Sequence, residues 1–119
     1  MNQKSLKQTE IQIQKTILDY LTLKGHFVFR VNVQGVPVHQ GNKVVGFRPS
    51  PMRGIADILG VLGKPVRGWH QGCFLAIECK RDDKQKTSEE QSLFLANILR
   101  KGGMAFVDTS IDDCIAAGL

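Results

Sequence analysis

Residues 73–80 read CFLAIECK, an apolar run that becomes charged at its end. A run of this length between turn-rich segments is typical of a buried β-strand. Side chains alternate along a strand, so Glu78 and Lys80 project from one face of the sheet and Cys79 projects from the other, into the core. The end of this strand is therefore predicted to present an acid and a lysine side by side.

A second apolar run, GIADILGVL at residues 54–62, is interrupted by Asp57. We predict a buried strand over residues 55–62. A carboxylate inside such a strand costs free energy unless its charge is compensated, and coordination of a metal ion is one form of compensation. If the two strands are neighbours, Asp57, Glu78 and Lys80 converge on one patch.

Helix signals frame these strands on both sides. Thr9 and Gln12 have the spacing of a capping box and precede an apolar stripe, and Ser88 and Gln91 repeat that spacing before a second stripe. Gly102 and Gly103 end the second pattern. We predict helices over residues 9–24 and 87–101 and a short one over residues 111–117.

Three further segments have strand patterns. HFVFRVNV at residues 26–33 alternates, which predicts a strand whose buried face carries the odd-numbered apolar residues, among them Phe27 and Phe29. The pair at residues 41–42, Gly-Asn, predicts a hairpin turn, and Pro37 places one arm at an edge or in a loop. MAFVD at residues 104–108 predicts the last strand.

The order of these elements predicts an α/β fold. A mixed β-sheet flanked by helices follows from the order α-β-β-β-α-β, with the hairpin as an insertion and the short helix at the end. Residues 73–108 are expected to form a right-handed crossover that joins parallel strands. At 119 residues, the chain is expected to be one domain, residues 1–119.

Composition narrows the class of protein. Hydrophobic residues make up 42% and charged residues 23% of the chain, as in ordinary soluble domains. No apolar run approaches the roughly 20 residues that span a bilayer, and residues 1–10 lack a secretory signal. We therefore expect an intracellular, cytoplasmic protein without a membrane partner. The formal net charge of +5 indicates a polyanionic partner, most often nucleic acid.

The three cysteines indicate neither disulfides nor a metal cage. Cys73, Cys79 and Cys114 are odd in number and irregularly spaced, which argues against a disulfide framework. His70, Cys73 and Cys79 lack the paired spacing of structural zinc ligands. A zinc site at these three residues is the alternative against which the acid–lysine patch is weighed.

The side chains predicted at this patch indicate which metal ion it could bind. Two carboxylates, a main-chain carbonyl and waters make an oxygen-rich site suited to Mg²⁺ or Mn²⁺. Such an ion lowers the pKa of bound water and stabilises charge on a phosphate, and a nearby lysine orients the water or offsets that charge. Asp57, Glu78 and Lys80 therefore have the residue types that suit a metal ion acting on a phosphate group.

The same residues carry a family resemblance. Asp57, followed after twenty residues by the tripeptide at 78–80, Glu-Cys-Lys, resembles the signature of the PD-(D/E)XK nucleases. Glu10, the segment GIAD and Gln91 add a resemblance to the VRR-NUC (virus-type replication-repair nuclease) branch, over residues 10 to about 108. Ala56 stands where a proline often precedes the acid. The resemblance implies a restriction-endonuclease-like fold and cleavage of DNA, with flaps and Holliday junctions among the candidate substrates.

The resemblance also implies a role for each matching residue in the strands. Asp57 and Glu78 would bind Mg²⁺ or Mn²⁺ through their side chains, and Cys79 would offer its main-chain carbonyl. Lys80 would be the catalytic lysine. These four residues are the centre of the implied active site.

Two helical residues have both a catalytic and a structural explanation. In the resemblance Glu10 reaches the site from the first helix, and Gln91 points from the second toward the metal or the attacked phosphate. Glu10 is also explained as a first-turn acid near the helix dipole. Gln91 is also explained by the capping box with Ser88.

Partners are the last expectation. Arg48 and Arg53 flank the start of the strand with Asp57, so they are the favoured phosphate contacts, with Arg30 as a third DNA-binding candidate. The resemblance further suggests a homodimer that presents two active sites. Two rival functions stay open: a nucleic-acid-binding module without catalysis, and a structural or assembly protein with a basic surface.

Overall fold

The structure is a computed structural model, and it describes residues 9–31, 36–48 and 52–119. Three helices and six strands occur in these residues, in the order that the sequence patterns predicted. They are α1 (Glu10–Leu23), β1 (Phe27–Arg30), β2 (Val36–Gln40), β3 (Lys43–Arg48), β4 (Ile58–Val61), β5 (Phe74–Cys79), α2 (Glu89–Arg100), β6 (Met104–Asp108) and α3 (Ile111–Ala116).

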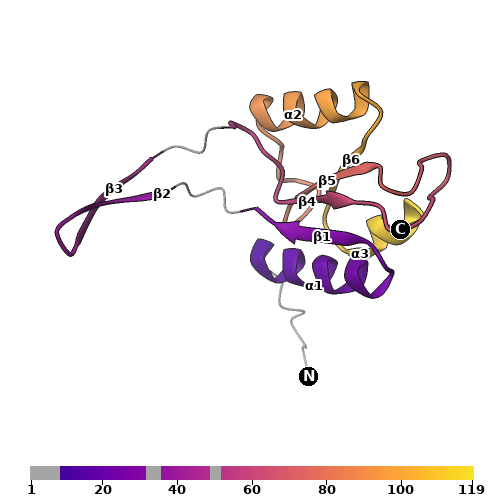
Figure 1. Cartoon of the computed structure of the whole chain (residues 1–119), viewed down its shortest axis with the longest axis horizontal. Coiled ribbons are helices and arrows are strands. Elements are labelled where there is room, and N and C mark those ends of the chain that lie inside the picture. Colours follow the sequence, from indigo (N-terminus) through magenta and orange to yellow (C-terminus); the bar gives the residue numbers. More distant parts are fainter. Residues whose placement is uncertain (1–8, 32–35, 49–51) are drawn as a thin grey trace.

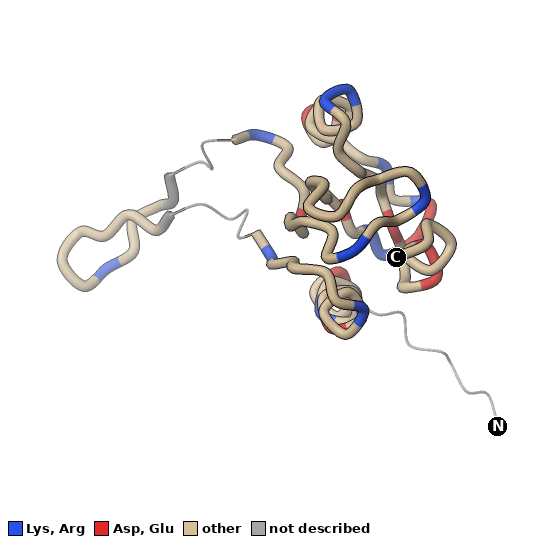
Figure 2. Tube along the Cα trace, turned by 45° about the vertical axis from the view of Figure 1, so that its right-hand side comes forward, with Lys and Arg blue, Asp and Glu red and all other residues tan. Residues whose placement is uncertain are grey.

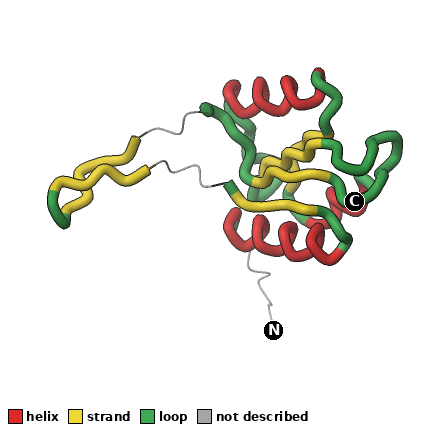
Figure 3. The backbone as a smooth tube through the Cα atoms, in the orientation of Figure 1, coloured by secondary structure: helices red, strands yellow, loops and turns green. Residues whose placement is uncertain are grey.

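Four strands form a mixed sheet in the order β1-β4-β5-β6. β1 and β5 both pair with β4 in antiparallel fashion, and β5 pairs with β6 in parallel. The helix α2 joins the two parallel strands, as predicted for residues 73–108. Helices lie on both sides of the sheet, with α1 on one face and α2 on the other (Figures 1 and 3). The predicted mixed α/β architecture is confirmed.

The hairpin forms a sheet of its own. β2 and β3 pair only with each other among the described strands, and the hairpin projects away from the rest of the molecule (Figure 1). Its turn lies at the predicted place, where Gly41 has a φ of +64°, a conformation that glycine adopts without steric cost. In a two-stranded ribbon both strands are edges, which suits Pro37.

Both predicted capping boxes are present. The Thr9 hydroxyl accepts from the Gln12 main chain and the Gln12 side chain accepts from the Thr9 N–H. Ser88 and Gln91 form the same reciprocal pair at the start of α2. Each box satisfies two of the N–H groups that a helix start leaves unpaired. Of the helices in the described residues, none has the length and apolarity that crossing a bilayer requires.

The core lies in two layers, one on each side of the sheet. Between the sheet and helices α1 and α3, buried side chains include Ile17, Ile58 and Ile77, which are fully shielded from solvent. Between the sheet and α2 lies a smaller cluster of mostly short side chains, with Leu95 as its largest buried member. α2 packs on β5 and β6, and no helix of the described residues lies over the β1 side of that face.

The buried face of β1 is the opposite of the predicted one. Phe27 is 70% exposed and Phe29 is 49% exposed, whereas His26 is buried and Val28 packs against the core under α1. The His26 Nδ1 accepts a hydrogen bond from the Gly63 N–H at 3.0 Å, while its Nε2 is buried without a hydrogen-bond partner among the described residues. Residues 32 and 33 of the predicted strand lie outside the described residues.

Candidate active site

Asp57, Glu78 and Lys80 lie together at one end of the sheet, as the strand patterns predicted. Asp57 comes directly before β4. Glu78 is the next-to-last residue of β5, and Lys80 directly follows β5. Their exposed fractions are only 8%, 2% and 6%. Buried charges of this kind need partners inside the protein, because water does not reach them.

Asp57 differs from its predicted position, since it precedes the strand and is not inside it. Its carboxylate accepts a hydrogen bond from the Cys79 N–H at 2.8 Å, and its carbonyl accepts from the Val31 N–H at 2.8 Å. The residue thus joins β1, β4 and β5 at the point where the regular ladder between β4 and β5 stops. The side chain is held against the Glu78–Lys80 segment by a main-chain group that any residue at position 79 would supply.

Gln91 brings α2 into the site. Its Nε2 donates to Glu78 Oε1 at 3.0 Å, and its Oε1 accepts from Lys80 Nζ at 3.0 Å. The same Oε1 also accepts from the Ser88 N–H. The cap and the place in the site are therefore compatible, because one amide caps the helix and also contacts both Glu78 and Lys80.

The electrostatics of the site are dominated by crowded carboxylates. Burial, the hydrogen bond and charge of Asp57, and the charge of Glu10 together raise the pKa of Glu78 to about 8, although Lys80 opposes them. Lys80 Nζ lies 3.7 Å from Glu78 Oε1, so one ammonium faces several acids. This crowding favours a protonated Glu78 at neutral pH.

Buried carboxylate oxygens in this region are left without a donor. They are Glu78 Oε2, Glu10 Oε1 and Asp108 Oδ1, and none has a hydrogen-bond partner among the described residues. Buried polar atoms are nearly always paired, so unpaired acceptors in a cluster of acids indicate a missing positive partner. Glu10 is half-buried at the start of α1, and its charge acts on Glu78.

The donor set fits a hard divalent cation. Within the described residues, no three His, Cys, Asp or Glu side chains form a ready-made metal cage. Mg²⁺ needs none, because it is usually held by one or two carboxylates and completes its shell with waters and phosphate oxygens. Asp57 and Glu78 would hold such an ion with their side chains, together with the Cys79 carbonyl.

The zinc alternative has no geometric support at its three residues. The Cys79 side chain is fully buried in the core on the α1 side, and burial and the neighbouring Asp108 raise its thiol pKa. The Cys73 thiol donates to the Gly102 carbonyl at 3.3 Å, and His70 is exposed. A buried thiol with a raised pKa is a poor source of the thiolate that zinc binds.

Two buried polar residues near the site were missed by the sequence patterns. Asp108 is 1% exposed, and its carbonyl accepts from the Lys80 N–H at 2.9 Å. Burial raises the pKa of its carboxyl to about 7, and one oxygen accepts from the Cys114 thiol at 3.4 Å. Gln14 is 8% exposed and lies one turn after Glu10 on the same side of α1. The sequence signal for Asp108 is its position as an acid at the end of the apolar run MAFVD, residues 104–108.

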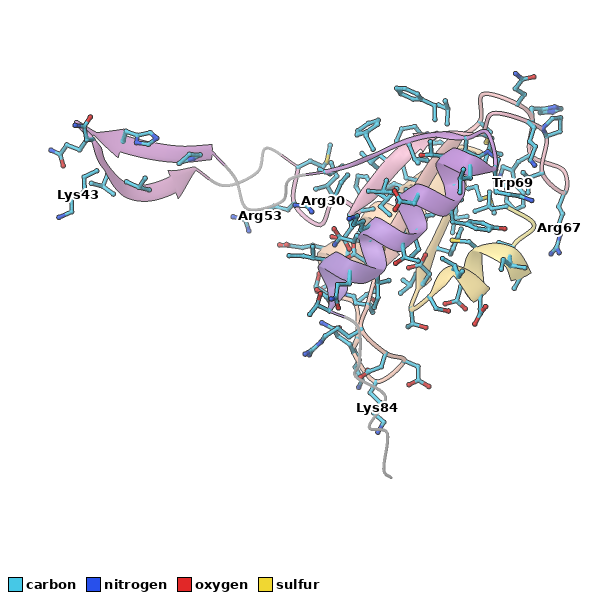
Figure 4. All side chains as sticks on the ribbon, turned by 90° about the horizontal axis from the view of Figure 1, so that it is seen from below. Arg30, Lys43, Arg53, Arg67, Trp69 and Lys84 are labelled. Carbon is cyan, nitrogen blue, oxygen red and sulfur yellow. The ribbon has the colours of Figure 1, made fainter. Side chains whose placement is uncertain are left out.

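The structure describes the side chains of two of the three candidate DNA-binding arginines, Arg30 and Arg53. Arg30, at the end of β1, and Arg53, before β4, lie at the end of the body from which the hairpin projects (Figure 4). Both are exposed, and Arg53 Nη1 lies 3.5 Å from the exposed Glu90 Oε1, a pair worth little in water. Arg48 ends β3, and its side chain lies outside the described residues. Figure 2 shows Lys and Arg on the body and also on the hairpin.

Comparison with protein-family models and with curated protein sequences finds no match to this chain. The proposal of function therefore depends on the geometry of this site and on the sequence resemblance.

Cys79→Ala separates the two kinds of metal site. If only the Cys79 carbonyl faces the metal, the variant should keep the predicted metal-dependent cleavage and lose about 1 kcal/mol of stability, because a small buried side chain is shortened. The measurements are cleavage rate against Mn²⁺ concentration, thermal unfolding and zinc content by elemental analysis. Stoichiometric zinc in the wild type that disappears in the variant would instead make the thiolate a ligand.

Proposed function

We propose that this chain is a Mg²⁺- or Mn²⁺-dependent nuclease that hydrolyses phosphodiester bonds in DNA. It would belong to the PD-(D/E)XK class, with a restriction-endonuclease-like fold and closest in type to the VRR-NUC branch. One observation carries the proposal: two buried carboxylates and a buried lysine meet at a strand end, and Gln91 links one of the carboxylates, Glu78, to the lysine. Acids so crowded that one stays protonated near neutral pH call for a cation at this place.

Each side chain has a task that its contacts support. When bound, the metal supplies positive charge for the attacked phosphate and lowers the pKa of water. Lys80 offers an ammonium that Gln91 holds at 3.0 Å, which suits it to orient the attacking water or to offset charge on the phosphate. Glu78 is held by the same amide, so Gln91 fixes the distance between acid and lysine.

A binding module without catalysis is the second candidate, and the charges of the site oppose it. A surface that only binds DNA gains from positive charge at the phosphates. Buried acids at the strand end repel phosphates unless a cation lies between them, and they cost folding free energy as well. Retention of Asp57, Glu78 and Lys80 in contact therefore favours catalysis over simple binding or a purely structural role.

Cleavage of labelled DNA tests the proposal. Single strands, duplexes, flaps and four-way junctions are incubated with the protein in Mn²⁺, in Mg²⁺ or in EDTA. We expect cleavage of at least one substrate with either metal and none in EDTA. Binding without cleavage of every substrate under all metal conditions would contradict the proposal and support the binding module. Light scattering on the same preparations tests the homodimer that the resemblance implies.

A further inference from the structure

The sheet face beside α2 carries exposed apolar side chains from three strands. In the register of the sheet, Phe27 lies opposite Val61 and Val61 opposite Phe74, and in the next row Phe29 lies opposite Leu59. Phe27, Phe29 and Phe74 are 70%, 49% and 40% exposed, and Leu59 and Val61 are half-buried. These five residues are called the aromatic face below.

The aromatic face leads directly to the candidate active site. Alternation along β4 and β5 puts Leu59 and Asp57 on one face, and likewise Phe74 and Glu78. The acids therefore form the third row of the same face, one row beyond Phe29. Successive rows along a strand are about 6.6–6.8 Å apart, so Phe29 and Phe27 lie at increasing distance from the acids along one line.

The rings of Phe27 and Phe29 offer separate exposed faces to unpaired bases. Their centroids are 6.4 Å apart and their planes meet at 60°, in edge contact, so they do not form one flat surface for a continuous stack of paired bases. Bases that have left such a stack can each lie against one ring. Stacking on aromatic side chains is the usual means of binding single-stranded nucleic acid, and it tolerates any sequence.

Charge at this end of the sheet favours DNA over a second protein chain as the occupant. Arg53 is exposed, precedes the strand with Asp57 and lies beside Glu90 in the first turn of α2, and the chain has a formal net charge of +5. Arg30 is exposed at the same end of the sheet (Figure 4), and alternation along β1 puts it on the face opposite Phe27 and Phe29. Guanidinium groups at this end of the sheet complement the phosphates of a strand whose bases lie on the rings.

We propose that the aromatic face binds unpaired nucleotides next to the cleaved bond, with one base on Phe29 and the next on Phe27. The preferred substrates are then DNAs with a single-stranded segment at the cleavage site, such as flaps and frayed junctions. This inference rests on the proposed nuclease function, because it places the cleaved phosphate at Asp57 and Glu78.

The test compares aromatic side chains at positions 27 and 29, which can stack on bases, with leucine, which cannot. In the Glu78→Gln background and in EDTA, the affinity for a labelled 12-nucleotide single strand and for the matching duplex is measured by fluorescence anisotropy. Phe27→Leu/Phe29→Leu removes stacking but keeps an apolar surface, Phe27→Trp/Phe29→Trp keeps both, and Ile115→Ala removes an exposed apolar side chain from α3 as a control. All are exposed in the structure, so the fold should survive, which thermal unfolding verifies.

We expect the Leu variant to lose at least ~10-fold in single-strand affinity and less than ~2-fold in duplex affinity. The Trp variant and Ile115→Ala should bind like the parent protein. Equal single-strand affinity of the Leu variant and the parent, or no single-strand binding by the parent, would overturn the inference. A Leu variant that binds normally but changes from dimer to monomer in light scattering would overturn it too, and would assign the face to self-association.

Failure of this inference and failure of the proposed function have different signatures. The binding measurements use a variant without catalysis and no metal, so they do not depend on cleavage. If the variants show the stacking pattern but the wild type never cleaves DNA, the role of the aromatic face is supported and the nuclease proposal is contradicted. If the wild type cleaves duplexes and flaps equally and the Leu variant binds single strands like the parent, only the nuclease proposal is supported.

Discussion

Glu78→Gln should lower the rate of metal-dependent cleavage by ~10³-fold or more, because it removes one of two carboxylates that would hold the ion while keeping the shape of the side chain. Asp57→Asn should have a similar effect, since an asparagine oxygen still accepts from the Cys79 N–H but has no charge. Single-turnover rates in Mn²⁺ measure the loss. Full activity in both variants would remove the basis of the nuclease proposal.

The same Glu78→Gln variant should be more stable than the wild type when no metal is bound. The pKa of Glu78 is raised from 4.5 to about 8, so its contribution to stability is fully present below pH 4.5 and is lost as the pH rises toward 8. Glutamine has no proton to lose. The difference in unfolding free energy should therefore be near zero at pH 4.5 and reach the order of a few kcal/mol in favour of the variant at pH 8.

Thermal unfolding in EDTA across this pH range measures that difference. Glu89→Gln is the matched control, because Glu89 is an exposed acid in the first turn of α2, and its variant should show no such dependence on pH. A Glu78→Gln protein that is less stable than the wild type at pH 8 would mean that Lys80 and Gln91 already compensate the charge. Addition of Mn²⁺ should raise the melting temperature of the wild type and not that of the variant.

Gly54→Ala should disturb both the fold and the site. Gly54 has a φ of +73°, and a Cβ there would overlap the Glu90 carbonyl and lie 2.7 Å from the Gln91 N. The loop before Asp57 would be forced away from the first turn of α2, which carries the amide that links Glu78 to Lys80. We expect a stability loss of about 2–4 kcal/mol and at least a ~10-fold lower cleavage rate at temperatures where the variant is folded.

Gly68→Ala is the control for backbone strain alone. Gly68 has a φ of +96°, and a Cβ there meets no atom within 4 Å. It should cost only the ~1–2 kcal/mol of the left-handed conformation and leave cleavage unchanged. If Gly54→Ala behaves like Gly68→Ala in both measurements, contact between the loop and α2 does not position the site.

Local patterns in the sequence were sufficient for the helices and for the central idea of the site. A capping box is a contact between residues three apart, so Ser88 and Gln91 reveal the start of α2 without knowledge of the fold. The two-residue period of a strand likewise places Glu78 and Lys80 on one face and Cys79 on the other. The meeting of Glu78 with Asp57 needed one further assumption, that two apolar strands pair, and they do.

Tertiary structure alone decided which sides of these elements are buried and how the acids are held. The alternation in residues 26–33 predicts a strand but says nothing of what covers each face; α2 packs on β5 and β6, so Phe27 and Phe29 stay exposed, and Gly63 gives buried His26 its partner. The double role of Gln91 and the support of Lys80 by Asp108 join residues from separate elements. Periodicity records the local geometry of the backbone, whereas burial and pKa depend on neighbours that only the folded chain brings together.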